Sequence, residues 1–234
     1  MEQTIRRLEE KLEQLTAQVG ILEDTQAIRK LHHQYGYYLD QCLYNEVLEL
    51  FADNGVAYFM GGIYKGKEQG VRRLYIDRFQ TRFTKGHNGP IYGFLLDHPQ
   101  MQDVITVSPD RKTAKGRFRC LMQAGLHESA EGQTRQWWEG GLYENEYVNE
   151  DGVWKIKTLN YRGLWHGDFD KGWAHTQPNL YPFPTVLFPE DPIGPDELIT
   201  DPKPWLWPDT AVVPFHYPHP VTGEKWEAKK PTNV

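Results

Sequence analysis

The sequence predicts an α+β protein in which N-terminal helices precede an antiparallel sheet. Most apolar residues before residue 84 recur at helical spacing, whereas the segments from Tyr92 onward alternate as strands do. Turn sequences such as Ser108-Pro109-Asp110 and Asn149-Glu150-Asp151-Gly152 connect those strands. Helices followed by a meander of strands are typical of the α+β class.

The first helix carries a heptad pattern. Its apolar residues are spaced alternately by three and four positions: Ile5, Leu8, Leu12, Leu15, Val19 and Leu22. About three heptads is near the lower limit for a free coiled coil. The pattern therefore indicates either self-association or an amphipathic helix that lies against its own domain, and we treat residues 1–22 as a separate helix.

The rest of the chain up to residue 168 forms one predicted domain, residues 23–168. Its expected helices lie at Thr25–Leu43, Glu46–Phe51 and Lys67–Phe83. Asp53-Asn54-Gly55 and Gly61-Gly62 act as breaks around the first strand. The expected strands are Val56–Met60, Tyr92–Leu96, Met101–Val107, Thr113–Leu126, Gln136–Val148 and Val153–Trp165.

A different composition begins near Asp168, after which thirteen of the 16 prolines occur. Proline interrupts helices and cannot donate to a strand ladder, so this segment is expected to be extended. It also contains too many aromatic residues for a solvated tail. We predict that residues 169–234 form an arm packed on the domain or on a neighbouring subunit.

Composition argues against several classes of function. The net charge is −6 with mixed signs along the chain, which does not favour nucleic-acid binding. No apolar run approaches ~18 residues and no secretory leader is recognisable, so we expect a cytoplasmic protein without membrane contact. Cys42 and Cys120 alone give no disulfide framework or zinc spacing, and no phosphate-binding glycine loop occurs. We therefore expect no cofactor.

Three polar residues are candidates for proton transfer. Asp40 lies late in an apolar helix, where it can be a general base, an anchor for one, or a carboxylate satisfied by an arginine. Tyr58 alternates with Val56 and Met60, so it either turns a phenol inward or only packs. His98 precedes Pro99 at a strand start, and histidines exchange protons near neutral pH, although a histidine at a turn is often a surface residue.

Further residues on the predicted sheet and helix are candidates for substrate binding. Strand alternation groups Trp137, Glu139 and Tyr143 on one face, and Arg119 shares a face with Arg117, for which surface charge is the alternative. The complete expected binding set is Tyr38, Arg119, Trp137, Glu139, Tyr143 and Tyr161.

Several of these segments resemble the SnoaL-like branch of the nuclear-transport-factor-2-like (NTF2-like) superfamily. The likeness spans about Glu23 to Trp173 and is most specific at Asp151-Gly152-Val153-Trp154-Lys155. It also includes Tyr38-Leu39-Asp40, the strand Val56 to Phe59, and Gly140-Gly141-Leu142-Tyr143-Glu144. The resemblance implies a cone-shaped fold, with helices and a curved sheet around a pocket.

Within that superfamily the chain resembles the scytalone dehydratases. Asp40, Tyr58 and His98 match that family's aspartate, tyrosine and first histidine. A second histidine is missing: Gln123 or Ala124 falls near its place, His127 is the nearest substitute, and Tyr143 stands where the family has an asparagine. The resemblance also implies a homo-oligomer, with a trimer as the first expectation.

The length, aromatic content and arm are similar to those of bacterial diarylpropane lyases, which remove water and formaldehyde from lignin-derived diols. Together the resemblances imply a cofactor-independent lyase acting on a small phenolic substrate. Two alternatives remain open at this point: an isomerase or cyclase like the ketosteroid isomerases and polyketide cyclases, and a non-catalytic binding or assembly module.

Overall fold

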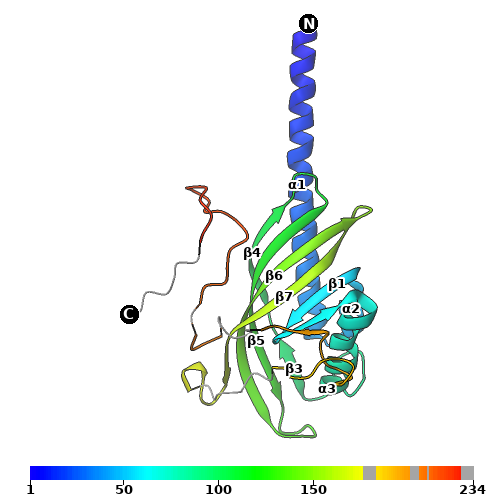
Figure 1. Ribbon diagram of the computed structural model, residues 1–234, viewed down its shortest axis with the longest axis vertical. Coiled ribbons are helices and arrows are strands. Elements are labelled where there is room, and N and C mark those ends of the chain that lie inside the picture. The colour runs from blue at the N-terminus through cyan, green and yellow to red at the C-terminus, as the bar shows by residue number, and fades with distance from the viewer. Residues whose placement is uncertain (176–182, 201–205, 210, 228–234) are drawn as a thin grey trace.

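The computed structural model describes residues 1–175, 183–200, 206–209 and 211–227. A long N-terminal helix projects from a body built on a curved eight-stranded sheet, with shorter helices near one end of that sheet (Figure 1). The α+β class expected from the sequence is confirmed. Within these described ranges, no helix has both the length and the apolar character needed to cross a bilayer.

The N-terminal helix α1 runs without interruption over Glu2–Asp40. This corrects the expectation of two separate helices, because no proline or strong cap separates them and the single Gly20 is tolerated inside a helix. After the short α2 (Tyr44–Glu49), the expected helix Lys67–Phe83 forms as three segments. These are the π-helical η1 (Gly66–Val71) and η2 (Arg73–Gln80), and α3 (Thr81–Thr84).

The strands follow the order β3-β5-β6-β7-β1-β2-β8, and β4 pairs with another stretch of β5. Their bounds are β1 Phe51–Phe59, β2 Gly62–Lys65, β3 Phe94–Asp97, β4 Gln100–Val107, β5 Thr113–Leu126, β6 Arg135–Glu150, β7 Val153–Asp168 and β8 Glu197–Leu198. The described strand pairs are antiparallel, as expected, except for β1–β7, which is parallel and makes the sheet mixed. No hairpin connects β1 to β7, and without a tight turn their direction is not constrained.

The described part of the arm packs on its own domain. Strand β8 pairs with β2, and Ile199 donates its N–H to the Gly61 carbonyl at 2.8 Å. Arg73 donates to the Gly194 carbonyl at 2.7 Å and to the Asp196 carboxylate at 2.6 Å. Residues 176–182, 201–205, 210 and 228–234 of the predicted arm lie outside the described residues.

The core lies between α1 and the inner face of the sheet. One side of α1 is buried there through Ile28, Leu31, Tyr35 and Leu39, at helical spacing. From the sheet, Phe118, Tyr143 and Leu159 join the same cluster. This packing places the C-terminal end of α1, and hence Asp40, beside the connection between strands β3 and β4.

Candidate active site

A cavity of about 540 Å³ opens between the end of α1, the helical segments after β2 and the inner face of the sheet. Its wall is rich in aromatic residues, among them Phe59, Phe79, Phe83, Phe94, Tyr143 and Tyr161. A largely apolar cavity of this size with a few polar groups is typical of a small-molecule site. The two histidines that line the cavity, His98 and His166, each belong to a buried polar cluster.

The first cluster joins Asp40 to His98. Asp40 is the last residue of α1, and its Oδ1 accepts the backbone N–H of His98 at 3.0 Å and also contacts His98 Nδ1. His98 is 4% exposed and lines the cavity. A carboxylate at Nδ1 favours the tautomer with the proton on that nitrogen, so Nε2 is the atom that can exchange a proton with a ligand.

His98 is held from its carbonyl side as well. It lies between β3 and β4, and Gln100 Nε2 donates to the His98 carbonyl at 2.9 Å. The other amide atom of Gln100 contacts His32 Nε2 at 3.0 Å. His98 is therefore fixed between the end of α1 and the buried polar centre of the domain.

The second cluster joins Glu139, Tyr161 and His166, which all line the same cavity. Tyr161 donates its hydroxyl proton to Glu139 Oε1, and His166 Nδ1 lies 3.1 Å from Glu139 Oε2. All three side chains are buried. The site thus contains a second imidazole that is backed by a carboxylate.

Sequence reasoning missed His166 because the predicted strand ended at Trp165, whereas β7 extends to Asp168, and because strand alternation breaks down just before His166. Gly141 pairs with Gly163, but the adjacent Gly140 pairs with Trp165, so one extra residue is inserted in β7. Such a bulge reverses the facing of the residues beyond it. His166 consequently pairs with Glu139 on the inner face, and Gly163 was the available signal, since an isolated glycine in a strand suggests a bulge.

Two more phenols form the inner wall of the cavity. Burial raises the pKa of the Tyr35 and Tyr143 phenols well above the ordinary value. Both therefore remain protonated at neutral pH and can donate a hydrogen bond. Tyr143 also contacts Tyr161 with ring centroids 5.0 Å apart, which continues the aromatic wall to the second cluster.

Cationic side chains gather toward the outside of the cavity. Arg78, Arg82, Lys85 and Arg135 are lining residues, with Glu131 as an acidic partner of Lys85. Arg82 and Lys85 are exposed, whereas Arg78 donates to the Tyr64 hydroxyl at 2.6 Å. An aromatic interior with cations at its mouth suits an aromatic ligand that carries a phenolate or another anionic group.

The structure brings most, but not all, of the expected site residues to this cavity. Trp137, Glu139, Tyr143, Tyr161 and His98 line it, and Asp40 supports His98. Tyr38 and Arg119 are not among its lining residues, and Arg119 is exposed on the outer face of β5. The alternative interpretation of Arg119, as a charged residue on the protein surface, is the one that the structure supports.

Tyr58 is also away from the cavity, so its expected convergence with Asp40 and His98 was wrong. The inward residues of β1 are Ala57, which pairs with buried Tyr64 and Leu159, and Phe59. Alternation identifies which residues share a face but not which face meets the core. Tyr58 therefore lies on the other face of β1, partly exposed.

None of the expected replacements for the missing second histidine lies at the cavity. Gln123 and Ala124 are not lining residues, and the inward residue nearby is Met122, opposite Glu139. His127 is exposed and its Nδ1 lies 2.6 Å from the Ser129 hydroxyl. The second imidazole of the site comes from β7 instead.

Comparison with solved structures shows that other proteins share this fold. Hexachlorocyclohexane dehydrochlorinase LinA-type3 from Novosphingobium barchaimii LL02 is 21% identical, with 69% of this chain and 99% of that one covered at a TM-score of 0.53. The LinA Type2 structure gives 21% identity, 70% and 99% coverage and a TM-score of 0.53. A putative scytalone dehydratase from Novosphingobium aromaticivorans gives 21% identity, 65% and 91% coverage and a TM-score of 0.49.

The curated protein sequences contain no match to this chain. The sequence model of the SnoaL-like domain, however, matches residues 20–160, which is more than half of the chain. The matched range runs from the start of the buried part of α1 to the middle of β7. The chain therefore belongs to the SnoaL-like domain family, within the NTF2-like superfamily.

Proposed function

We propose that this protein is a cofactor-independent lyase that eliminates water from a phenolic aromatic substrate, with loss of formaldehyde where the substrate carries a hydroxymethyl group. The observation that carries the proposal is the pair of carboxylate-backed imidazoles, His98–Asp40 and His166–Glu139, on one aromatic cavity. An elimination needs an acid for the leaving hydroxyl and a base for the remaining proton. Two supported imidazoles can supply both.

The chemistry balances without an external oxidant or reductant. A phenol para to the reacting carbon gives up its proton, and the ring electrons expel a benzylic hydroxyl that leaves as water after protonation. The product is a quinone methide. If a hydroxymethyl group on the neighbouring carbon then loses its O–H proton, formaldehyde leaves and the electrons of the broken carbon–carbon bond form a double bond to the benzylic carbon. The exocyclic electron pair of the quinone methide returns to the ring, which becomes aromatic again, and the ring oxygen takes up a proton.

The remaining cavity groups fit this substrate class. Tyr143 stays protonated and can donate to a substrate oxygen, and the aromatic wall accommodates ring systems. Arg78 and Arg82 near the mouth favour a phenolate or carboxylate on the substrate. Negative charge that develops on the substrate during the reaction would be stabilised by these fixed hydrogen-bond donors, which is a common source of rate enhancement.

Incubation with a panel of phenolic diols, followed by mass spectrometry, tests the proposal. We expect products that have lost water, or water and formaldehyde. His98→Ala and Asp40→Asn should lower turnover by at least about tenfold, because a positioned proton-transfer group contributes about 10² to 10⁴ in rate. Tyr58→Phe is the matched control and should leave turnover unchanged, because this phenol is outside the cavity.

Two results would contradict the proposal. A product with the same mass as its substrate would indicate an isomerase. Full activity in His98→Ala, with an unchanged fold by circular dichroism, would remove this histidine from the reaction.

A further inference from the structure

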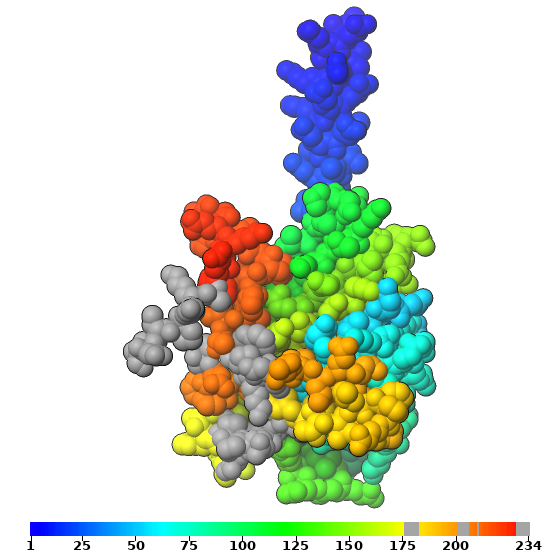
Figure 2. All heavy atoms as spheres, in the orientation of Figure 1, coloured from blue at the N-terminus to red at the C-terminus, as the bar shows by residue number. Residues whose placement is uncertain are grey.

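The apolar heptad residues of α1 form an exposed stripe on the part of the helix that projects from the body. Residues 2–19 are exposed throughout, which at 1.5 Å per residue corresponds to about 27 Å of helix. Figure 2 shows this part standing clear of the rest of the molecule. The stripe consists of Ile5, Leu8, Leu12, Leu15, Val19 and Leu22, with exposed fractions between 50 and 66%. We call these six residues the heptad seam.

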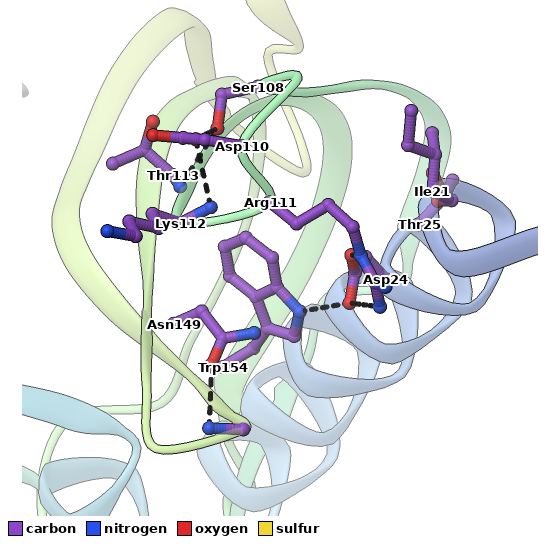
Figure 3. Close-up of polar contacts among 11 residues, drawn as sticks. Ile21, Asp24, Thr25, Ser108, Asp110, Arg111, Lys112, Thr113, Asn149 and Trp154 are labelled. Atoms are coloured by element: carbon purple, nitrogen blue, oxygen red, sulfur yellow. Dashed lines mark hydrogen bonds and ion pairs between the residues drawn. The ribbon is translucent and has the colours of Figure 1, made fainter. Parts of the chain in front are cut away.

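The domain cannot cover this seam because it holds the opposite side of the same helix. Figure 3 shows Asp24 facing the β4–β5 turn and β7, where its carboxylate binds Arg111 and accepts the Trp154 indole N–H at 2.9 Å. Asp24 and Leu22 are two residues apart, so their side chains point about 200° apart around the helix. Leu22 is accordingly exposed while Asp24 is buried. The alternative of an amphipathic helix lying on its own domain is thereby excluded for this segment.

We propose that the heptad seam pairs with the same seam of a second copy of this chain in a parallel two-stranded coiled coil. The a positions are Ile5, Leu12 and Val19, and the d positions are Leu8, Leu15 and Leu22. Two of the three a residues, Ile5 and Val19, are β-branched and all three d residues are leucine, a combination that favours two parallel strands. This inference rests on α1 alone and is independent of the proposed reaction.

The residues that flank the seam are compatible with parallel pairing. In this arrangement each g residue lies near the e residue of the following heptad on the other helix. The resulting pairs are Thr4 with Glu9, Lys11 with Thr16, and Gln18 with Glu23. None brings like charges together, so the seam can close along its length. The rest of the exposed helix surface carries charged residues, including an Arg6–Glu10 ion pair within the helix.

The solution mass of the full chain, measured by light scattering after size exclusion over a range of concentrations, tests the pairing. We expect twice the chain mass of 27.3 kDa for the unaltered protein. The double variant Leu8→Glu/Leu15→Glu should fall to the single-chain mass, because two layers of the seam then meet as like charges. The control Gln14→Glu/Ala17→Glu adds the same charge at exposed c and f positions and should keep the doubled mass.

A second variant tests the orientation. Leu15 meets itself only when the helices are parallel, so Leu15→Cys should form a disulfide-linked dimer on mild oxidation, whereas Ala17→Cys should not. A single-chain mass for the unaltered protein, or a doubled mass that survives the Leu8/Leu15 charges, would overturn the pairing. A threefold mass would overturn the strand number, and failure of Leu15→Cys to cross-link would overturn the parallel orientation.

Discussion

Each of the two histidines that line the cavity has a carboxylate at its Nδ1. Asp40 contacts Nδ1 of His98, and Glu139 contacts Nδ1 of His166. The carboxylate fixes the orientation and the tautomer of the ring. Glu139 is additionally held by the Tyr161 hydroxyl, so this buried acidic group does not rely on the histidine alone.

The second histidine gives a prediction that separates proton transfer from packing. If one imidazole donates and the other accepts, activity falls both at low pH, where the base is protonated, and at high pH, where the acid has lost its proton. His166→Gln should lower turnover at least about tenfold and remove one limb of that profile. Glu139→Gln should also lower turnover. His127→Gln, at an exposed position, is the control and should preserve both limbs. An unchanged profile in His166→Gln would show that this ring only packs.

At the scale of elements, the position of α1 depends on a small polar cluster at the base of its projecting part. Asp24 receives hydrogen bonds from Arg111, in the β4–β5 turn, and from Trp154, on β7 (Figure 3). The hydrogen bonds from Arg111 are the main cause of the lowered pKa of Asp24. A side chain at position 20 would collide with the Arg111 guanidinium, so Gly20 leaves space for this arginine beside the helix.

This cluster predicts a stability cost for Asp24→Asn. An asparagine oxygen can still accept from Trp154 Nε1 and Arg111 Nη2, but the amide NH₂ group then replaces the oxygen that accepts from Arg111 Nε, so two donors face each other and the negative charge is lost. The free energy of unfolding, measured with urea, should fall by about 1–3 kcal/mol, the usual cost of an unsatisfied buried polar group. The control Glu13→Gln removes the same charge from an exposed site on α1 and should change the free energy of unfolding by less than about 0.5 kcal/mol. Equal effects of the two substitutions would contradict the anchoring role.

At the scale of the whole molecule, a buried histidine joins the helix to the sheet. His32 is fully buried and stacks on Phe118, and its Nδ1 lies 3.3 Å from the Asn145 amide nitrogen and 3.2 Å from the Tyr147 hydroxyl. Burial lowers the pKa of His32 from 6.5 to about 3. This ring is therefore neutral in the folded protein at ordinary pH, and its role is structural.

The lowered pKa of His32 predicts acid sensitivity of the entire fold. Between its folded and unfolded pKa values the unfolded chain binds the additional proton, so stability contributed by the neutral ring is lost as pH falls. The free energy of unfolding should decline by up to about 1.4 kcal/mol per pH unit through this residue. Urea unfolding of the unaltered protein and of His32→Gln, measured between about pH 6 and 4, separates the contribution of His32 from that of other groups. The free energy of unfolding should change less steeply with pH in the variant. If the free energy of unfolding changed equally with pH in both proteins, the acid sensitivity would come from groups other than His32.

The α+β class, the long strands and the first of the two polar pairs were predictable from the sequence. Helical spacing and strand alternation are local patterns, and they gave the positions of β5, β6 and β7 closely. Asp40 and His98 were selected from their places at a helix end and beside a proline, together with the family resemblance. Both signals lie within a few residues of the side chain concerned.

Tertiary structure alone decided which faces and segments meet. The inward face of β1 depends on its pairing with β2 and β7, which excluded Tyr58, and the inserted residue in β7 turned His166 toward Glu139. The parallel β1–β7 pair and the single continuous α1 were likewise not visible in local periodicity. Alternation states which residues share a face, whereas burial of that face is set by partners distant in the sequence.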